Sequence, residues 1–224
     1  MNEEYLFPTP VWWCDLPDIN LNELRQTIYE VRDDHDTQVR SNVGGYQSQD
    51  FNGDFLLTCD DALGDLARAL QERAVGCYSR FQSAATEIKL ANLWININEG
   101  PHYNQTHTHP GSVLSGAFYV TAPEGSGRII FHRDHASAFN YASLGTMEDF
   151  ATGQDDAGFM YNQFSYPPIE GRLIIFPSWI PHGVETGTNT SERISISFNF
   201  VPVKLDGVIE YGSLKHRNRI RYAM

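Results

Sequence analysis

The 224-residue sequence is poor in three features that would place it in other protein classes. Its only cysteines are Cys14, Cys59 and Cys77, and their scatter and odd number predict neither a disulfide framework nor a cysteine-rich metal cluster. Lysine and arginine total 16 against 28 aspartates and glutamates, and the net charge of −12 argues against nucleic acid as a partner. No apolar run approaches the length of a membrane span, so no membrane partner is expected.

The first five residues are acidic and lack a cationic segment followed by an apolar one. We therefore expect no secretory signal and a cytoplasmic location, where free cysteines stay reduced. The one basic cluster, Lys215, Arg217, Arg219 and Arg221, lies near the end of the chain. Such a short cluster is typical of a solvated or subunit-contacting tail, and a homodimer contact is one role for it.

The N-terminal part predicts two amphipathic helices. Residues 21–32 carry apolar side chains at helical spacing behind the capping residue Asn20, and residues 60–81 carry a second apolar stripe that begins at Asp60. Residues 35–55 between them are polar and glycine-rich, which predicts a loop. Residues 6–13 are apolar but interrupted by Pro8 and Pro10, so they form an edge strand at best.

From about residue 88 the pattern changes to alternation of apolar and polar residues, which predicts strands. The expected strands are 88–98, 113–121, 128–131, 173–176 and 193–200. Short strands between Gly/Pro turns indicate a mainly β jelly roll, with the two helices on one outer face. Residues 132–170 lack a period and predict a lid or a subunit contact. We expect one domain over 1–224: a helical cover (1–85), a jelly-roll core (86–203) and a tail (204–224).

The candidate site is the motif His107-Thr108-His109 together with the distant His182. Residues two apart on a strand point to the same face, so His107 and His109 can aim their imidazoles at one point. His182 follows an apolar run that predicts a buried strand, and it can complete the set from across the barrel. A lone histidine is more often solvated or bonded to backbone, but three converging ones predict a facial site for iron or another first-row ion.

A second signal follows eleven residues after His182. Arg193 and Ser195 are two apart at the start of the last strand, so both can point where His182 points. A guanidinium offers a bidentate fork to a carboxylate, and a hydroxyl adds a donor, which suits a small keto-diacid. The competing interpretation pairs Arg193 with a surface acid such as Glu185 or Glu192. Asn96 and Asn98, on the strand before the histidine motif, and Tyr119, on the strand after it, are further candidates to hydrogen-bond a bound keto-acid.

These elements resemble the 2-oxoglutarate/Fe(II)-dependent oxygenases, most closely their prolyl-hydroxylase-like branch. The similarity covers roughly residues 88–203, and the run from His107 to Gly116 is its most specific part. The resemblance implies a double-stranded β-helix, Fe(II) held by His107 and His182, and 2-oxoglutarate whose far carboxylate lies on Arg193 and Ser195. It implies coupling of 2-oxoglutarate decarboxylation to hydroxylation of a small-molecule or peptide substrate.

The sequence departs from this family at the second metal ligand, where an acid is usual and His109 stands. Asp134 is an alternative second ligand if its loop folds back, although the offset of two residues favours His109. Three-histidine iron sites also occur in cupin-type dioxygenases that use no keto-acid, which is the second hypothesis. A non-catalytic jelly-roll module that holds a metal is the third.

Overall fold

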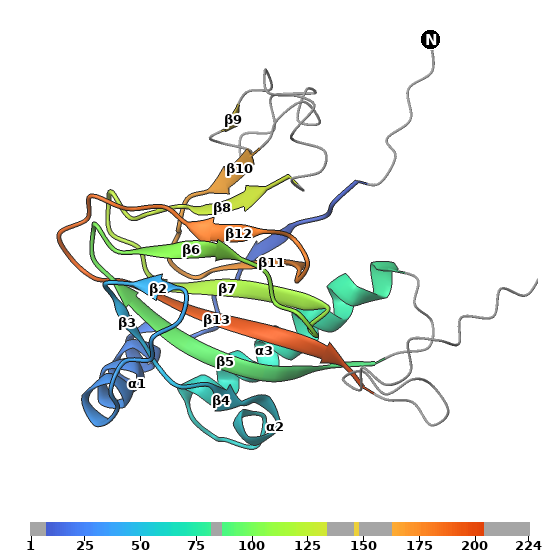
Figure 1. The fold of residues 1–224 in the computed structure, drawn as a ribbon. Coiled ribbons are helices and arrows are strands. Elements are labelled where there is room, and N and C mark those ends of the chain that lie inside the picture. Colours follow the sequence, from blue (N-terminus) through green and yellow to red (C-terminus); the bar gives the residue numbers. More distant parts are fainter. Residues whose placement is uncertain (1–7, 82–86, 134–145, 148–162, 204–224) are drawn as a thin grey trace, which may run out of the picture.

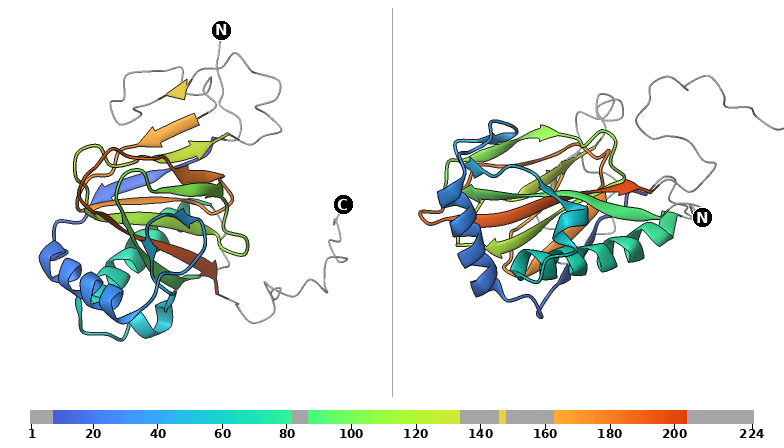
Figure 2. Two further views of the ribbon diagram at one scale, coloured as in Figure 1. Left: turned by 60° about the vertical axis from the view of Figure 1, so that its left-hand side comes forward. Right: turned by 90° about the horizontal axis from the view of Figure 1, so that it is seen from below.

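The computed structural model describes residues 8–81, 87–133, 146–147 and 163–203. Within these residues two β-sheets face each other, and helices cover the outer face of one of them (Figures 1 and 2). The major sheet has the order β1 (Trp12–Asp15), β11 (Arg172–Pro177), β7 (Leu114–Thr121), β13 (Arg193–Pro202), β5 (Ile88–Asn98) and β3 (Tyr46–Gln47), with β4 (Phe51–Asn52) also paired to β5. The mainly β class with flanking helices is confirmed.

The minor sheet has the order β2 (Asn42–Val43), β6 (Tyr103–His107), β12 (His182–Val184), β8 (Ile129–His132), β10 (Gln163–Tyr166) and β9 (Thr146–Met147). Neighbouring strands in both sheets are antiparallel, except that β9 and β10 are parallel. This is the two-sheet arrangement of a jelly roll.

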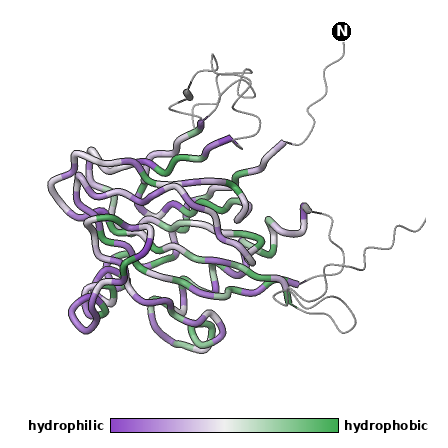
Figure 3. Tube along the Cα trace, in the orientation of Figure 1, coloured by the Kyte–Doolittle hydropathy of each residue, from purple (hydrophilic) through white to green (hydrophobic). Residues whose placement is uncertain are grey.

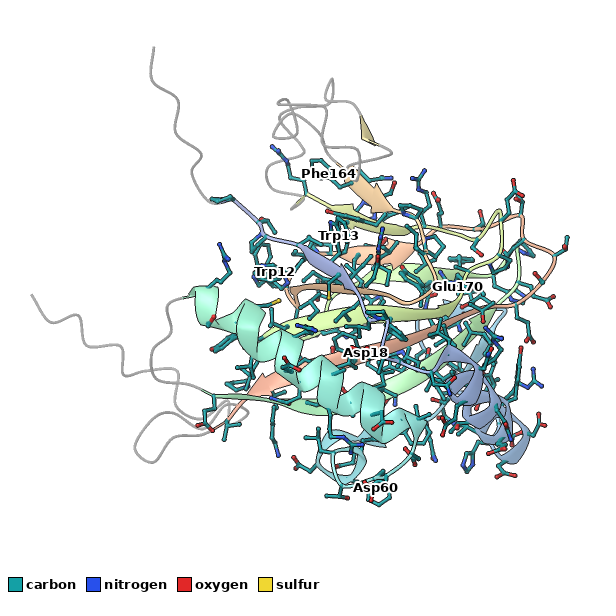
Figure 4. The ribbon with its side chains drawn as sticks, turned by 180° about the vertical axis from the view of Figure 1, so that it is seen from behind. Trp12, Trp13, Asp18, Asp60, Phe164 and Glu170 are labelled. Carbon is teal, nitrogen blue, oxygen red and sulfur yellow. The ribbon has the colours of Figure 1, made fainter. Side chains whose placement is uncertain are left out.

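Two helices pack on the outer face of the major sheet. They are α1 (Leu21–Asp34) and α3 (Ala62–Tyr78), and the short α2 (Gly53–Leu56) lies beside them. The helix α1 buries only Leu24 and Ile28, and most of it is hydrophilic in Figure 3. Seen from behind in Figure 4, α3 crosses the sheet below Trp12 and Trp13 of the edge strand β1. Among the described residues no helix has both the length and the apolar character to cross a membrane.

Side chains along the central strands alternate between an apolar face and a polar face, and both faces are buried. One face of β5, β7 and β13 is apolar and packs against the helices through Leu93, Ile95, Ile97, Phe118, Val120, Ile194, Ile196, Phe198 and Phe200. The opposite face points into the space between the sheets and is largely polar on β5 and β13, yet it too is buried. Burial of a polar strand face is costly unless the groups are paired, so this face marks the functional interior.

The structure corrects several boundaries. The predicted loop 35–55 contains β2, β3, β4 and most of α2, and the strand β12 was not predicted. The segment 132–170 was expected to lack regular structure, but its described residues include β10 and β9. The remainder of that segment, 134–145 and 148–162, and the tail 204–224 lie outside the described residues. The cap of α3 is Asp61, whose side chain accepts a hydrogen bond from the backbone N–H of Gly64, and not Asp60.

Candidate metal centre and anion pocket

A pocket lies between the two sheets and encloses about 500 Å³, its open mouth included. The candidate residues from both sheets meet in it. The lining side chains are Ser41, Trp94, Asn96, Asn104, His107, His109, Ala117, Tyr119, Ile129, Phe176, His182, Val184, Arg193, Ser195 and Ser197. None of these is acidic, so in the described part of the chain the pocket carries histidines and one guanidinium but no carboxylate. Its electrostatics suit an anion despite the net negative charge of the protein.

His107 and His182 are neighbours in the minor sheet. They are register partners on β6 and β12, so their side chains leave the sheet on the same face. Position 182 therefore joins the site from the adjacent strand, and not from across the barrel as the sequence suggested. The Nδ1 of His107 lies 2.7 Å from the carbonyl oxygen of Gln105, and that of His182 lies 2.9 Å from the carbonyl of Ile180. A carbonyl only accepts, so each Nδ1 carries the hydrogen and each Nε2 keeps a free lone pair.

His109 reaches the same point from outside the strand. It lies two residues beyond the last residue of β6, so the prediction that a continuous strand aligns it with His107 is wrong. Its position is set by a hydrogen bond from its backbone N–H to the carbonyl of Ser178 (3.0 Å), in the turn before β12. Its Nε2 lies 3.2 Å from the Nε2 of His182, and its ring lies 5.7 Å from that of Trp94.

The three imidazoles fit a metal ion. One ligand nitrogen from each of His107, His109 and His182 lies within 4.8 Å of the others. Two nitrogens at right angles about an ion, each roughly 2.1 Å from it, are about 3 Å apart, so only small shifts complete the geometry. Burial lowers the pKa of His182 to about 3 and that of His109 to about 4, with the neighbouring histidines adding to the effect. Both rings are therefore neutral at pH 7, as metal ligands must be.

Aromatic packing holds the cluster on one side. The ring of Phe176 lies 4.5 Å from that of His182 in a T-shaped arrangement, and Phe131 lies 4.9 Å from Phe176. No carboxylate joins the histidines among the described residues. Asp134, the alternative second ligand, lies outside the described residues.

Arg193 lies on the major sheet and is 3% exposed. Its Nη1 donates to the carbonyl of Gly127 (3.1 Å) and its Nη2 to the Oδ1 of Asn98 (3.0 Å), while its buried Nε has no acceptor in the described structure. No carboxylate lies within ion-pair distance of it among the described residues. An unpaired buried cation is costly, so Arg193 is suited to bind an anion in the pocket.

The surface acids that might have paired with Arg193 are engaged elsewhere. Glu192 accepts from Arg32 (3.1 Å) and from the hydroxyl of Tyr29 (2.7 Å). Glu185 accepts from the backbone N–H of Arg128 (3.2 Å). The pocket-facing interpretation of Arg193 therefore agrees with the geometry, and the surface ion pair does not form.

Three other predicted residues form a row across the pocket. Ser195 is the register partner of Asn96 on β5 and of Tyr119 on β7. The amide of Asn96 donates to the Oγ of Ser197 (3.1 Å). Burial raises the pKa of Tyr119 to about 12, against the opposing effect of the Arg193 charge, so its hydroxyl stays a neutral donor. This row lies beside Arg193 and offers hydroxyl donors to an anion held there.

Sequence reasoning missed Asn104 in the pocket. Strand alternation from His107 places residue 104 on the opposite face, but a register shift between His182 and Val184 makes Asn104 the partner of Val184, on the face of the histidines. Its buried Oδ1 has no hydrogen-bond partner in the described structure. The bulge that re-aims it is not visible in the sequence; Gly183, which permits the close approach, is the one signal present.

Comparisons with known proteins bear on the family and the fold. Residues 92–199, from β5 to β13, match a family described as "Putative 2OG-Fe(II) oxygenase". A comparison with curated protein sequences finds no match. The pocket between two jelly-roll sheets, with its histidine cluster, is a candidate metal site. This match makes residues 92–199 similar to the 2-oxoglutarate/Fe(II) oxygenases, a family of enzymes that use Fe(II) and 2-oxoglutarate.

Solved structures share the fold at low sequence identity. A Pseudomonas putida prolyl 4-hydroxylase is 12% identical, covers 86% of this chain and 92% of its own, and has a TM-score of 0.56. HygX from Streptomyces hygroscopicus, solved with nickel and 2-oxoglutarate, is 9% identical over 87% and 84% of the two chains, with a TM-score of 0.55. A Trichoplax adhaerens prolyl hydroxylase, solved with a hypoxia-inducible-factor peptide, is 11% identical over 84% and 83%, with a TM-score of 0.51. These similarities establish the double-stranded β-helix fold.

Proposed function

We propose that this protein is an oxygenase that hydroxylates a C–H bond of a small-molecule or peptide substrate. The overall reaction converts substrate, 2-oxoglutarate and O2 to hydroxylated substrate, succinate and CO2. The observation that carries the proposal is the buried Arg193, which has no carboxylate partner among the described residues and faces the same pocket as three convergent histidines.

Each part of the pocket has a role in this proposal. His107, His109 and His182 hold Fe(II) through their Nε2 atoms, because His107 and His182 have Nδ1 committed to backbone carbonyls. When bound, Fe(II) supplies the redox chemistry with O2. Arg193 binds the far carboxylate of 2-oxoglutarate through its free Nε–H and remaining Nη–H donors, and Ser195 adds a hydroxyl.

The charge balance supports an anionic cosubstrate. Three neutral imidazoles leave the ion its full charge of about +2 and Arg193 adds one positive charge, so the site favours a dianion such as 2-oxoglutarate. Asn96 and Tyr119 supply further donors along the row between Arg193 and the histidines. Phe176, Phe131 and Trp94 exclude water from one side of the centre, which strengthens these interactions.

The test is an anaerobic titration of Fe(II)-loaded protein with 2-oxoglutarate, following the visible charge-transfer band of the chelate. The wild type is expected to give the band, and Arg193→Ala to bind 2-oxoglutarate at least ten-fold more weakly with unchanged iron content. Arg40→Ala, which breaks an exposed ion pair with Asp50, is the matched control and is expected to behave as wild type. An unchanged 2-oxoglutarate affinity in Arg193→Ala would remove the anchor assignment.

One observation favours a second candidate. The histidine cluster contains no carboxylate among the described residues, as in dioxygenases that use three histidines and no keto-acid. If iron binds but 2-oxoglutarate produces no band, and O2 is consumed without succinate, this second function replaces the first.

A further inference from the structure

The orientation of Arg193 is fixed by a chain of two asparagines. Its Nη2 donates to the Oδ1 of Asn98 (3.0 Å), and the Nδ2 of Asn98 donates to the Oδ1 of Asn42 (2.7 Å). The Nδ2 of Asn42 in turn donates to the backbone carbonyl of Tyr46 (2.9 Å) and, in a longer hydrogen bond, to the Oδ1 of Asn96 (3.4 Å). The side chains of Arg193, Asn98 and Asn42 are all buried.

Only one assignment of donors and acceptors satisfies this series of hydrogen bonds. Arginine is donor-only, so Asn98 must present its oxygen to Arg193 and its NH2 group to Asn42. The carbonyl of Tyr46 is acceptor-only, so Asn42 must present its NH2 group there and its oxygen to Asn98. An amide flip at either asparagine would oppose two donors or two acceptors inside the protein, which is costly. The two ends therefore determine both amides.

Asn98 thus contacts Arg193 and not a ligand, since both ends of its amide are engaged. The local packing is built around these amides. A Cβ on Gly45 would lie 2.4 Å from the Nδ2 of Asn98 and 3.0 Å from the Oδ1 of Asn42, so glycine leaves the space they occupy. The amide of Asn189 also donates to the backbone carbonyl of Asn98 (3.3 Å).

Asn42 comes from a segment that joins both sheets. It lies on β2, which pairs with β6 of the minor sheet, while β3 four residues later pairs with β5 of the major sheet. The segment 42–47 therefore spans the two walls of the pocket at the Arg193 end. Its place in the fold links the N-terminal part of the chain to the anion end of the site.

We propose that Asn42 is a positioning residue that orients the Arg193 guanidinium through Asn98 and so tunes 2-oxoglutarate affinity. This inference rests on the proposed function. It assigns part of the cosubstrate site to the N-terminal segment, which otherwise acts as a cover for the sheet. Loss of the Asn42 acceptor frees the Asn98 amide to rotate, so the Asn98 Oδ1 that accepts from Nη2 is no longer held in place.

The experiment measures 2-oxoglutarate binding by calorimetry on metal-free and Ni(II)-loaded protein. Asn42→Leu preserves approximate volume and removes both the donor and the acceptor of the Asn42 amide, and it is expected to weaken 2-oxoglutarate binding about ten- to hundred-fold with Ni(II) affinity unchanged. In an Arg193→Ala background the same substitution is expected to have a much smaller effect, limited to its contact with Asn96, because its main influence passes through the guanidinium. Asn20→Ala, which removes a helix-capping amide remote from the pocket, is the control and leaves 2-oxoglutarate affinity unchanged.

Asn98→Asp is a second variant that tests the same hydrogen bonds if Asn42→Leu does not fold. It is nearly isosteric and places a carboxylate beside Arg193, so it is expected to fold and to weaken 2-oxoglutarate binding at least ten-fold. If the wild type does not bind 2-oxoglutarate, the proposed function fails. If the wild type binds 2-oxoglutarate, wild-type 2-oxoglutarate affinity in Asn42→Leu would overturn the positioning role. An equal loss of affinity from Asn42→Leu with and without Arg193 would overturn it as well. Should Asn42→Leu not fold, wild-type affinity in Asn98→Asp would overturn it.

Discussion

Gly183 sets the separation of the two strands that carry His107 and His182. A Cβ at this position would lie 2.8 Å from the carbonyl oxygen of Asn104 and 3.2 Å from the backbone nitrogen of Thr106, both on β6. These are backbone atoms, so no side-chain rotation relieves the contact. In Gly183→Ala, β6 must move away from β12 by roughly half an ångström or more to regain ordinary van der Waals separation.

The substitution Gly183→Ala is expected to lower metal affinity more than it lowers the stability of the fold. Insertion of one methyl group into close packing costs about 1–3 kcal/mol of unfolding free energy. Metal–ligand distances tolerate only about ±0.2 Å, so the same displacement spoils the convergence of His107 with His182. We expect metal affinity to fall about ten- to hundred-fold, as for other substitutions that disturb ligand support.

The assay is anaerobic calorimetric titration with Fe(II) or Ni(II), together with urea unfolding of the metal-free protein. Gly76→Ala is the matched control, because a Cβ on this helical glycine meets nothing within 4 Å. It is expected to raise stability by about 0.5–1 kcal/mol without changing metal affinity. Wild-type metal affinity in a folded Gly183→Ala protein would refute the claim that this strand contact sets the ligand geometry.

Three further predictions concern the surroundings of the site. The metal-free protein should lose stability as the pH falls from 6.5 towards 4, because in this range His109 and His182 take up protons only in the unfolded state. The loss of unfolding free energy is at most about 2 kcal/mol for each histidine at pH 5, and urea unfolding across this pH range measures it. A flat profile would contradict their neutral burial. Phe176→Ala should cost about 3–5 kcal/mol in the same assay and weaken Ni(II) binding, whereas unchanged binding would show that the ring does not support His182. Asp61→Ala should cost about 0.5–2 kcal/mol by loss of a helix cap, with Ni(II) and 2-oxoglutarate affinities intact.

The sequence predicted the long strands well because alternation persists over many residues. The strand expected at 88–98 is β5 (Ile88–Asn98), and the one expected at 193–200 begins at Arg193 as β13 does. It also brought together His107, His109 and His182, although the stated reason was wrong for His109, which lies beyond the strand, and for His182, which lies on the adjacent strand and not across the barrel. A hydrogen bond to Ser178, remote in sequence, places that residue, and no local spacing encodes such a contact.

The parts that escaped prediction have tertiary causes. The strands β2 and β3 have two residues each, too few to show a period, and they form because β6 and β5 lie beside them. Asn42 therefore lay in a segment predicted to be loop. The register shift that turns Asn104 inward depends on the pairing of β6 with β12, which a single sequence does not specify.

The two faces of β13 are under different evolutionary constraints. Ile194, Ile196 and Phe198 pack against the helix side, whereas Arg193, Ser195 and Ser197 line the pocket. In a library of all single substitutions, even positions of this strand will report on cellular abundance and odd positions on turnover. The pocket-lining positions can therefore change to accept a new substrate while the neighbouring positions, which pack against the helices, keep the fold stable.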